Sequence, residues 1–178
     1  MCGIVGLFLK DKSMEAQLGA MLTDMLITMT DRGPDSAGIA IYSQDTVNIG
    51  KMTVQSDTPD VDFDKLTGDL KKRIKGDVDI RVQSTHAVLE LRADQVIVAR
   101  EALKEIRPNI RIMSTGDSLE IYKEVGLPKD VASRFDIAKM SGSHGIGHTR
   151  MATESAGTTM GAHPLNTCSD QALVHNAA

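Results

Sequence analysis

Short apolar runs alternate with amphipathic segments along the chain. Residues 3–9 and 36–42 are runs of Ile, Val, Leu and small residues, bounded by charged or Gly-Pro turns, as is typical of buried strands. Between them, residues 13–29 carry Met and Leu at helical spacing, which predicts a helix with one apolar face. The chain is therefore expected to begin with a strand, a helix and a second strand.

Residues 44–141 form a long middle region in which predicted strands and helices alternate, and we interpret it as a small inserted α/β lobe. The patterns predict strands at 47–54, 78–83, 87–92 and 109–114, and helices at 63–75, 93–106, 118–125 and 129–135. The stretch 142–147 has the order G-x-x-G-x-G, which differs from the dinucleotide fingerprint. We expect its glycines to allow close backbone packing. A last buried strand is predicted at 172–175.

Composition and charge narrow the class of protein. The chain has 178 residues, 41% hydrophobic and 25% charged, and a net charge of −4, which argues against nucleic acid or an acidic membrane surface as a partner. No apolar run has the length of a membrane span, and the start lacks the features of a signal peptide. The two cysteines, Cys2 and Cys168, form no C-x-x-C or metal-type pattern. We expect a reduced, cytoplasmic protein.

Cys2 is the strongest candidate for chemistry. Removal of Met1 would give one residue both a thiol and a free α-amino group. A free cysteine titrates near pH ~8.5 and an α-amino group near ~7.7–8.0, so the amine can act as the base for its own thiol. The structural alternative is that Cys2 is a buried strand residue, and Cys168 is interpreted as structural or incidental.

Five motifs together resemble one family, the class II glutamine amidotransferases. In order, they are Cys2–Gly6 (CGIVG), Arg32–Gly38 (RGPDSAG), His148–Thr153 (HTRMAT), Ala162–Pro164 (AHP) and Val174–Asn176 (VHN). The long middle lobe and the Met-rich first helix look most like the glutamate-synthase-type subunits of the family, which include those of N-methylglutamate-synthase-like complexes.

The resemblance implies an α+β fold, the N-terminal-nucleophile αββα sandwich. Residues 1–178 would form part of this amidotransferase domain, with residues 44–141 as the inserted lobe. We expect the sandwich to be incomplete at its C-terminus and the sequence to be truncated, because the chain stops right after a core strand and before the second half of the sandwich.

The resemblance also implies hydrolysis of glutamine to glutamate and ammonia, with ammonia passed to a synthase partner and no metal or organic cofactor. By position, Cys2 would be the nucleophile, and the Asn176 side chain and the Ala177 backbone N–H would bind the oxyanion. Arg150 and Thr153 would bind the substrate α-carboxylate, and His163 and Arg32 would line or brace the pocket. Acyl transfer needs such a nucleophile, proton carrier and oxyanion donors, and a guanidinium suits a free carboxylate.

Alternatives and departures accompany this interpretation. Taken singly, Arg150 fits a surface ion pair and Thr153 a turn cap. Ala177 stands where the family usually has glycine, Met151 replaces an aromatic of several relatives, and the family's acidic residue for the substrate amine would lie beyond residue 178. We therefore expect this chain alone to have weak or no glutaminase activity. The alternatives are a non-catalytic glutamine-sensing or scaffold subunit, and an amide or penicillin-type hydrolase, which Arg150 and Thr153 disfavour.

Overall fold

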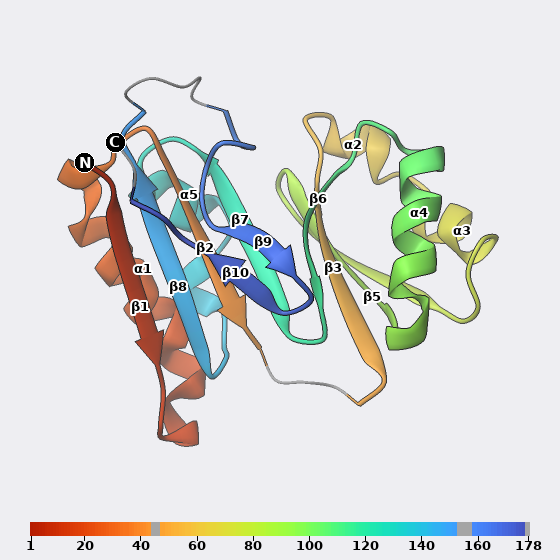
Figure 1. Ribbon diagram of the computed structural model, residues 1–178, viewed down its shortest axis with the longest axis horizontal. Coiled ribbons are helices and arrows are strands. Elements are labelled where there is room, and N and C mark those ends of the chain that lie inside the picture. The colour runs from red at the N-terminus through yellow and green to blue at the C-terminus, as the bar shows by residue number, and fades with distance from the viewer. Residues whose placement is uncertain (44–46, 153–157, 177–178) are drawn as a thin grey trace.

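The computed structural model describes residues 1–43, 47–152 and 158–176. Its first sheet has four antiparallel strands in the order β1-β8-β2-β7. These strands are β1 (Gly3–Phe8), β2 (Ser36–Tyr42), β7 (Leu119–Val125) and β8 (His144–Arg150). Figure 1 shows this sheet at the left, with α1 (Leu18–Thr28) and α5 (Pro128–Arg134) behind it. The predicted strands at 3–9 and 36–42 are confirmed as β1 and β2, but only β2 is buried along nearly its whole length, because β1 alternates buried and exposed residues.

Leucines of α1 close the helix-covered face of this sheet. Leu22 and Leu26 are almost fully buried, and β8 meets them with glycines. A Cβ atom on Gly145 would lie 2.6 Å from Leu22 Cδ1, and one on Gly147 would lie 2.5 Å from Leu26 Cδ1. The expected close packing of the glycine-rich stretch is therefore confirmed. The stretch also begins a central strand, β8, which the sequence patterns did not predict.

The lobe between β2 and β7 has its own antiparallel sheet, with strand order β4-β5-β3-β6. Its elements are β3 (Ile49–Gln55), α2 (Pro59–Asp62), α3 (Leu66–Lys71), β4 (Val78–Gln83), β5 (His86–Arg92), α4 (Val96–Ile106) and β6 (Arg111–Gly116). Leucines of α3 and α4 pack with Met52 and Leu89 on one face of this sheet. The order βαββαβ with this strand arrangement is ferredoxin-like.

The secondary structure near the end of the predicted lobe range 44–141 differs from the prediction. Residues 118–125, predicted as a short helix, instead form β7, which pairs with β2 in the first sheet. The sheet of the lobe therefore ends at Gly116. The helix prediction was wrong because Glu120 and Lys123 are buried and bonded, so the strand lacks the usual alternation of apolar and exposed polar positions.

Short 3₁₀ segments also occur in the described part of the chain. They are η1 (Lys12–Gln17), η2 (Thr30–Arg32), η3 (Ala93–Gln95) and η4 (Ile137–Lys139). The first of them replaces the start of the predicted helix 13–29, where the Asp11 carboxylate accepts the Ser13 N–H at 2.9 Å. None of the helices in the described ranges combines the length and the apolar character needed to cross a membrane.

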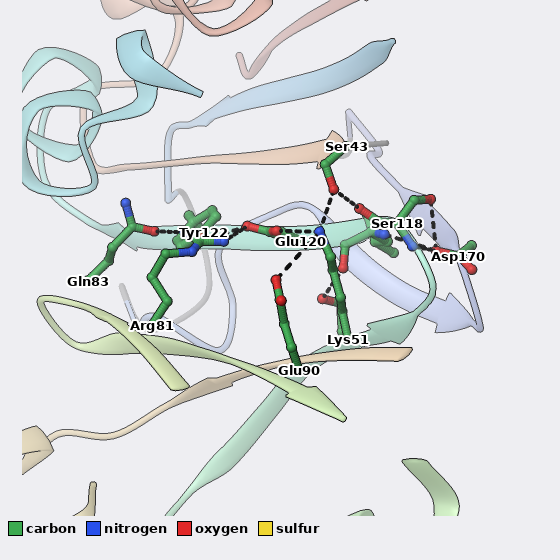
Figure 2. A network of polar contacts seen from close by, with 11 residues as sticks. Ser43, Lys51, Arg81, Gln83, Glu90, Ser118, Glu120, Tyr122 and Asp170 are labelled. Carbon is green, nitrogen blue, oxygen red and sulfur yellow. Dashed lines mark hydrogen bonds and ion pairs between the residues drawn. The ribbon is translucent and has the colours of Figure 1, made fainter. Parts of the chain in front are cut away.

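A buried network of charges joins the lobe to the first sheet (Figure 2). The Glu120 carboxylate of β7 accepts from Lys51 Nζ of β3 at 3.0 Å and from Arg81 Nη2 of β4 at 2.8 Å. The hydroxyl of Tyr122 donates to the same carboxylate at 2.7 Å. The side chains of Lys51 and Glu120 are 8% and 6% exposed. The polar face of the lobe sheet is therefore held against β7 by one buried ion pair, Lys51–Glu120, and one half-exposed pair, Arg81–Glu120.

The hairpin of β9 (Leu165–Cys168) and β10 (Gln171–Leu173) covers part of the other face of the first sheet. The partly buried Ala172 packs there against the apolar cluster that contains Ala40 and Leu119. Among the described residues, the hairpin supplies the part of a second β-layer over this face of the first sheet. The four-layer αββα sandwich therefore stays a prediction. Figure 1 shows the hairpin in front of β2 and β7.

Asp170, in the turn between β9 and β10, fastens the hairpin to the β6–β7 turn. Its carboxylate accepts the backbone N–H groups of Asp117 at 2.7 Å and of Ser118 and Leu119 at 2.9 Å. Burial raises the pKa of this carboxyl, but these donors outweigh burial and leave the pKa below its usual value.

Asp170→Ala should lower the free energy of unfolding by about 2 kcal/mol, because it removes several hydrogen bonds to a charged acceptor. Urea denaturation measures the change. Ser169→Ala, in the same turn, is the matched control and should change stability by less than about 0.5 kcal/mol. Equal stabilities of the two variants would contradict this role of Asp170.

Candidate active site

Cys2 and Arg150 lie at the same end of neighbouring strands. The ladder between β1 and β8 ends at the pair Gly3–Thr149. Cys2 and Arg150 are the next residues beyond this pair on the two segments. On its other side, Arg150 pairs with Ser36 of β2. Cys2 is a free cysteine and is 6% exposed, while Arg150 is half-buried. The fold therefore brings the predicted nucleophile and the predicted carboxylate ligand together from positions far apart in the sequence.

The turn before β2 fixes the end of β8. A Cβ atom on Gly33 would lie 2.5 Å from the backbone nitrogen of Arg150, so this turn needs glycine to lie against the strand. The backbone N–H of Asp35 donates to the Arg150 carbonyl at 3.0 Å, and the Asp35 carboxylate accepts the N–H of Ala152 at 2.7 Å. Arg32 is exposed at the end of η2, and its predicted bracing role stays a prediction.

Three histidines gather on the face covered by the hairpin. The ring of His163 lies 4.6 Å from that of His148 and 5.9 Å from that of His175, measured between centroids. His148 Nε2 lies 3.1 Å from the His175 carbonyl oxygen. Because a carbonyl can only accept, this nitrogen carries the proton and donates. His148 therefore holds the backbone just before Asn176.

Burial keeps two of these imidazoles neutral. It lowers the pKa of fully buried His148 to about 4, with a smaller contribution from His163. Burial and the charge of Lys123 likewise lower the pKa of His163. Both rings are therefore uncharged near neutral pH, where they can act as neutral hydrogen-bonding groups.

The structure describes only some of the residues predicted to bind the oxyanion and the substrate carboxylate. Asn176 is exposed and directly follows His175, whereas Ala177 and Thr153 lie outside the described residues. His163 is partly buried. A Cβ atom on Gly38 would lie 2.3 Å from the His163 carbonyl oxygen, so the backbone of His163 lies directly against Gly38. Within the described ranges, no group of three His, Cys, Asp or Glu residues is arranged to hold a metal ion.

Sequence reasoning missed two residues that shape this site. Asp35 stood inside a recognised motif without a role, although its carboxylate holds the backbone that follows Arg150. Lys123 belonged to a segment predicted as a helix and was not considered, although its ammonium is buried beside the His163 segment. Both bond to backbone atoms distant in the sequence, so no spacing pattern signals them.

Comparison with known proteins agrees with the resemblance carried by the motifs. No family model matches the chain. It is 61% identical over all 178 residues to the glutamine amidotransferase-like protein GlxB of Rhizobium meliloti (strain 1021), of which it covers 59%. It is 31% identical over 191 aligned positions to a putative glutamine amidotransferase of Methanothermobacter thermautotrophicus, of which it covers 61%.

A shorter part of the chain is similar to enzymes whose names state a further activity. The chain is 43% identical over 65 residues, 36% of its length, to the glutamine–fructose-6-phosphate aminotransferase (isomerizing) of Streptococcus pyogenes serotype M6, covering 11% of that protein. Similarity to glutamine amidotransferase-like proteins thus extends along the whole chain, and the chain spans about three fifths of the length of the two relatives that match it throughout.

Proposed function

We propose that this chain is the glutaminase part of a class II glutamine amidotransferase, hydrolysing glutamine and passing ammonia to a synthase partner. The observation that carries the proposal is the placement of Cys2 beside Arg150 at the end of two paired strands. The full-length similarity to glutamine amidotransferase-like proteins supports the same substrate. The lobe between β2 and β7 and the Met-rich helix favour a glutamate-synthase-type subunit.

In this mechanism the Cys2 thiolate attacks the side-chain carbonyl carbon of glutamine, and the α-amino group of Cys2 takes the thiol proton. The oxyanion accepts hydrogen bonds from the Asn176 amide and the Ala177 N–H, and each such donor typically contributes about 10²–10³ in rate. The C–N bond then breaks, and ammonia leaves with the proton from the amine. Water hydrolyses the thioester, which releases glutamate and restores the thiol.

Processing of Met1 is a condition of this mechanism. The Met1 amine lies 3.4 Å from Met151 Sδ, and residue Met1 is 73% exposed, so an aminopeptidase can reach it. Intact-mass measurement of the full-length protein should show loss of Met1. The same protein should release glutamate from glutamine and not aspartate from asparagine. Loss of Met1 without glutamate release would contradict catalysis and favour a glutamine-sensing subunit.

Arg150→Lys should raise the KM for glutamine roughly 10- to 100-fold with a smaller fall in kcat, because a lysine cannot bind the α-carboxylate with two parallel hydrogen bonds. Steady-state glutamate release measures both constants. Arg73→Lys, on the exposed lobe surface, is the matched control and should leave KM unchanged. An unchanged KM in Arg150→Lys would remove Arg150 from the substrate site.

A further inference from the structure

Lys123 is a buried cation that, within the described part of the chain, is bonded to backbone carbonyls. It lies on β7 and is 3% exposed. Its Nζ donates to the Ala162 carbonyl at 2.7 Å and to the Met160 carbonyl at 3.4 Å. None of the ion pairs found among the described residues includes Lys123. Burying an ammonium without a carboxylate is costly, and burial lowers the pKa of Lys123 to about 8.

The segment that Lys123 holds touches the candidate site at two points. A Cβ atom on Gly161 would lie 2.9 Å from Arg150 Nη1, so this backbone lies directly against the guanidinium. Two residues later, the ring of His163 lies 4.6 Å from that of His148. A shift of residues 160–163 would therefore move the surroundings of both Arg150 and His148.

Gly38 sets the depth at which this segment rests on the sheet. The carbonyl oxygen of His163 would lie 2.3 Å from a Cβ on Gly38, and the Cβ of Lys123 would lie 2.5 Å from it. Gly38 pairs with Lys123 on one side and with His148 on the other. The hydrogen bonds of Lys123 therefore hold residues 160–163 against the backbone of Gly38. A residue with a Cβ atom at position 38 would collide with this segment.

We infer that Lys123 is a positioning residue for the glutamine site: its ammonium fastens residues 160–163 to the sheet and so sets the positions of the Arg150 guanidinium and His163. This inference rests on the proposed function for its kinetic consequence. Lys123 is not placed in contact with the substrate, so its effect is on how the site is assembled.

Lys123→Met tests the inference in the full-length protein, because methionine keeps the apolar stem but cannot donate. The KM for glutamine should rise roughly 10-fold with kcat changed by less than about threefold, in line with loss of charged hydrogen bonds. Lys123→Arg, which can donate to both carbonyls, should recover most of the loss. Lys51→Met removes a lysine of similar burial from the Glu120 network, away from residues 160–163, and is the control for a loss of stability alone.

Two measurements do not depend on turnover. Hydrogen exchange of the peptide covering residues 158–164 should speed up in Lys123→Met and not in Lys51→Met. The His163 imidazole pKa, followed by NMR, should rise in Lys123→Met, because the Lys123 charge is one of the causes that lower it. Gly38→Ala should raise KM in the same way, since its methyl group displaces the His163 carbonyl without changing any charge.

The inference is overturned if exchange of residues 158–164 and the His163 pKa are the same in Lys123→Met and Lys51→Met. It is also overturned if Lys123→Arg behaves like Lys123→Met in a folded protein. A protein with the expected exchange and titration changes but no glutamate release in any form would contradict the proposed function and leave the positioning role supported.

Discussion

Under the proposed function, Cys2→Ala should abolish glutamate release, with a fall of about 10⁴-fold or more, because removing the proposed nucleophile leaves only the contribution of binding and oxyanion donors. Cys2 precedes β1 and is 6% exposed, so alanine fits its site with little change in packing. The measurement is glutamate formed from glutamine by the full-length protein.

Cys168→Ala is the control for this experiment, because Cys168 is the other free cysteine and lies exposed in β9. Its activity should stay within about twofold of the unsubstituted protein, as expected for a surface change. A glutamine-like electrophile should add one mass increment to the protein and none to Cys2→Ala. Glutamate release that survives Cys2→Ala would place the nucleophile elsewhere.

Glu120→Gln should lower the free energy of unfolding by about 3 kcal/mol, because it leaves the buried ammonium of Lys51 without its closest carboxylate. Arg81 shares the same carboxylate but is 46% exposed, so water compensates part of its loss. Urea denaturation measures the effect. Glu101→Gln, which breaks an exposed ion pair on α4, is the control and should cost less than about 0.5 kcal/mol.

Combining Glu120→Leu with Lys51→Met should recover much of the stability lost in Glu120→Gln, since no uncompensated ammonium then remains. A double variant less stable than Glu120→Gln would show that the network stabilises by more than charge compensation.

The network also predicts a pH dependence of the free energy of unfolding. Burial raises the pKa of Glu120, but Arg81 and Lys51 lower it more, so the folded value lies below the ordinary 4.5. Its stabilising contribution is therefore complete above pH ~4.5 and is lost as the pH falls through the folded value.

Apolar runs predicted the elements that bury apolar residues on both faces. The predicted run 36–42 coincides with β2, where nearly every residue is buried. The polar strands were missed for a physical reason. In β8, buried His148 has its partner in the His175 carbonyl, and in β7, Glu120 has its partners in the lobe. The sequence shows the polar side chains but not the distant groups that satisfy them.

The residues of the candidate site likewise fall into those that the motifs suggested and those that the sequence patterns missed. The motifs identified Cys2 and Arg150 by residue type, and the ladder of β1 and β8 explains why they meet. Asp35 and Lys123 could not be found from spacing, because each bonds to main-chain atoms that fold back from more than thirty residues away. Residue type therefore suggests candidates for chemistry, whereas the groups that hold the backbone around them are found only in the folded structure.

The lobe has a consequence for the order of folding. About 75 residues separate β2 from β7, yet these strands pair directly, and closing a loop of that length costs about 2 kcal/mol more entropy than closing one of ten residues. Within the lobe, β3 and β6 are neighbours, with Lys51 opposite Gly116, so its two ends come out side by side. Once the lobe has formed, β7 follows β2 as it would across a short turn. We therefore expect the lobe to fold first and to act as the nucleus on which the first sheet closes.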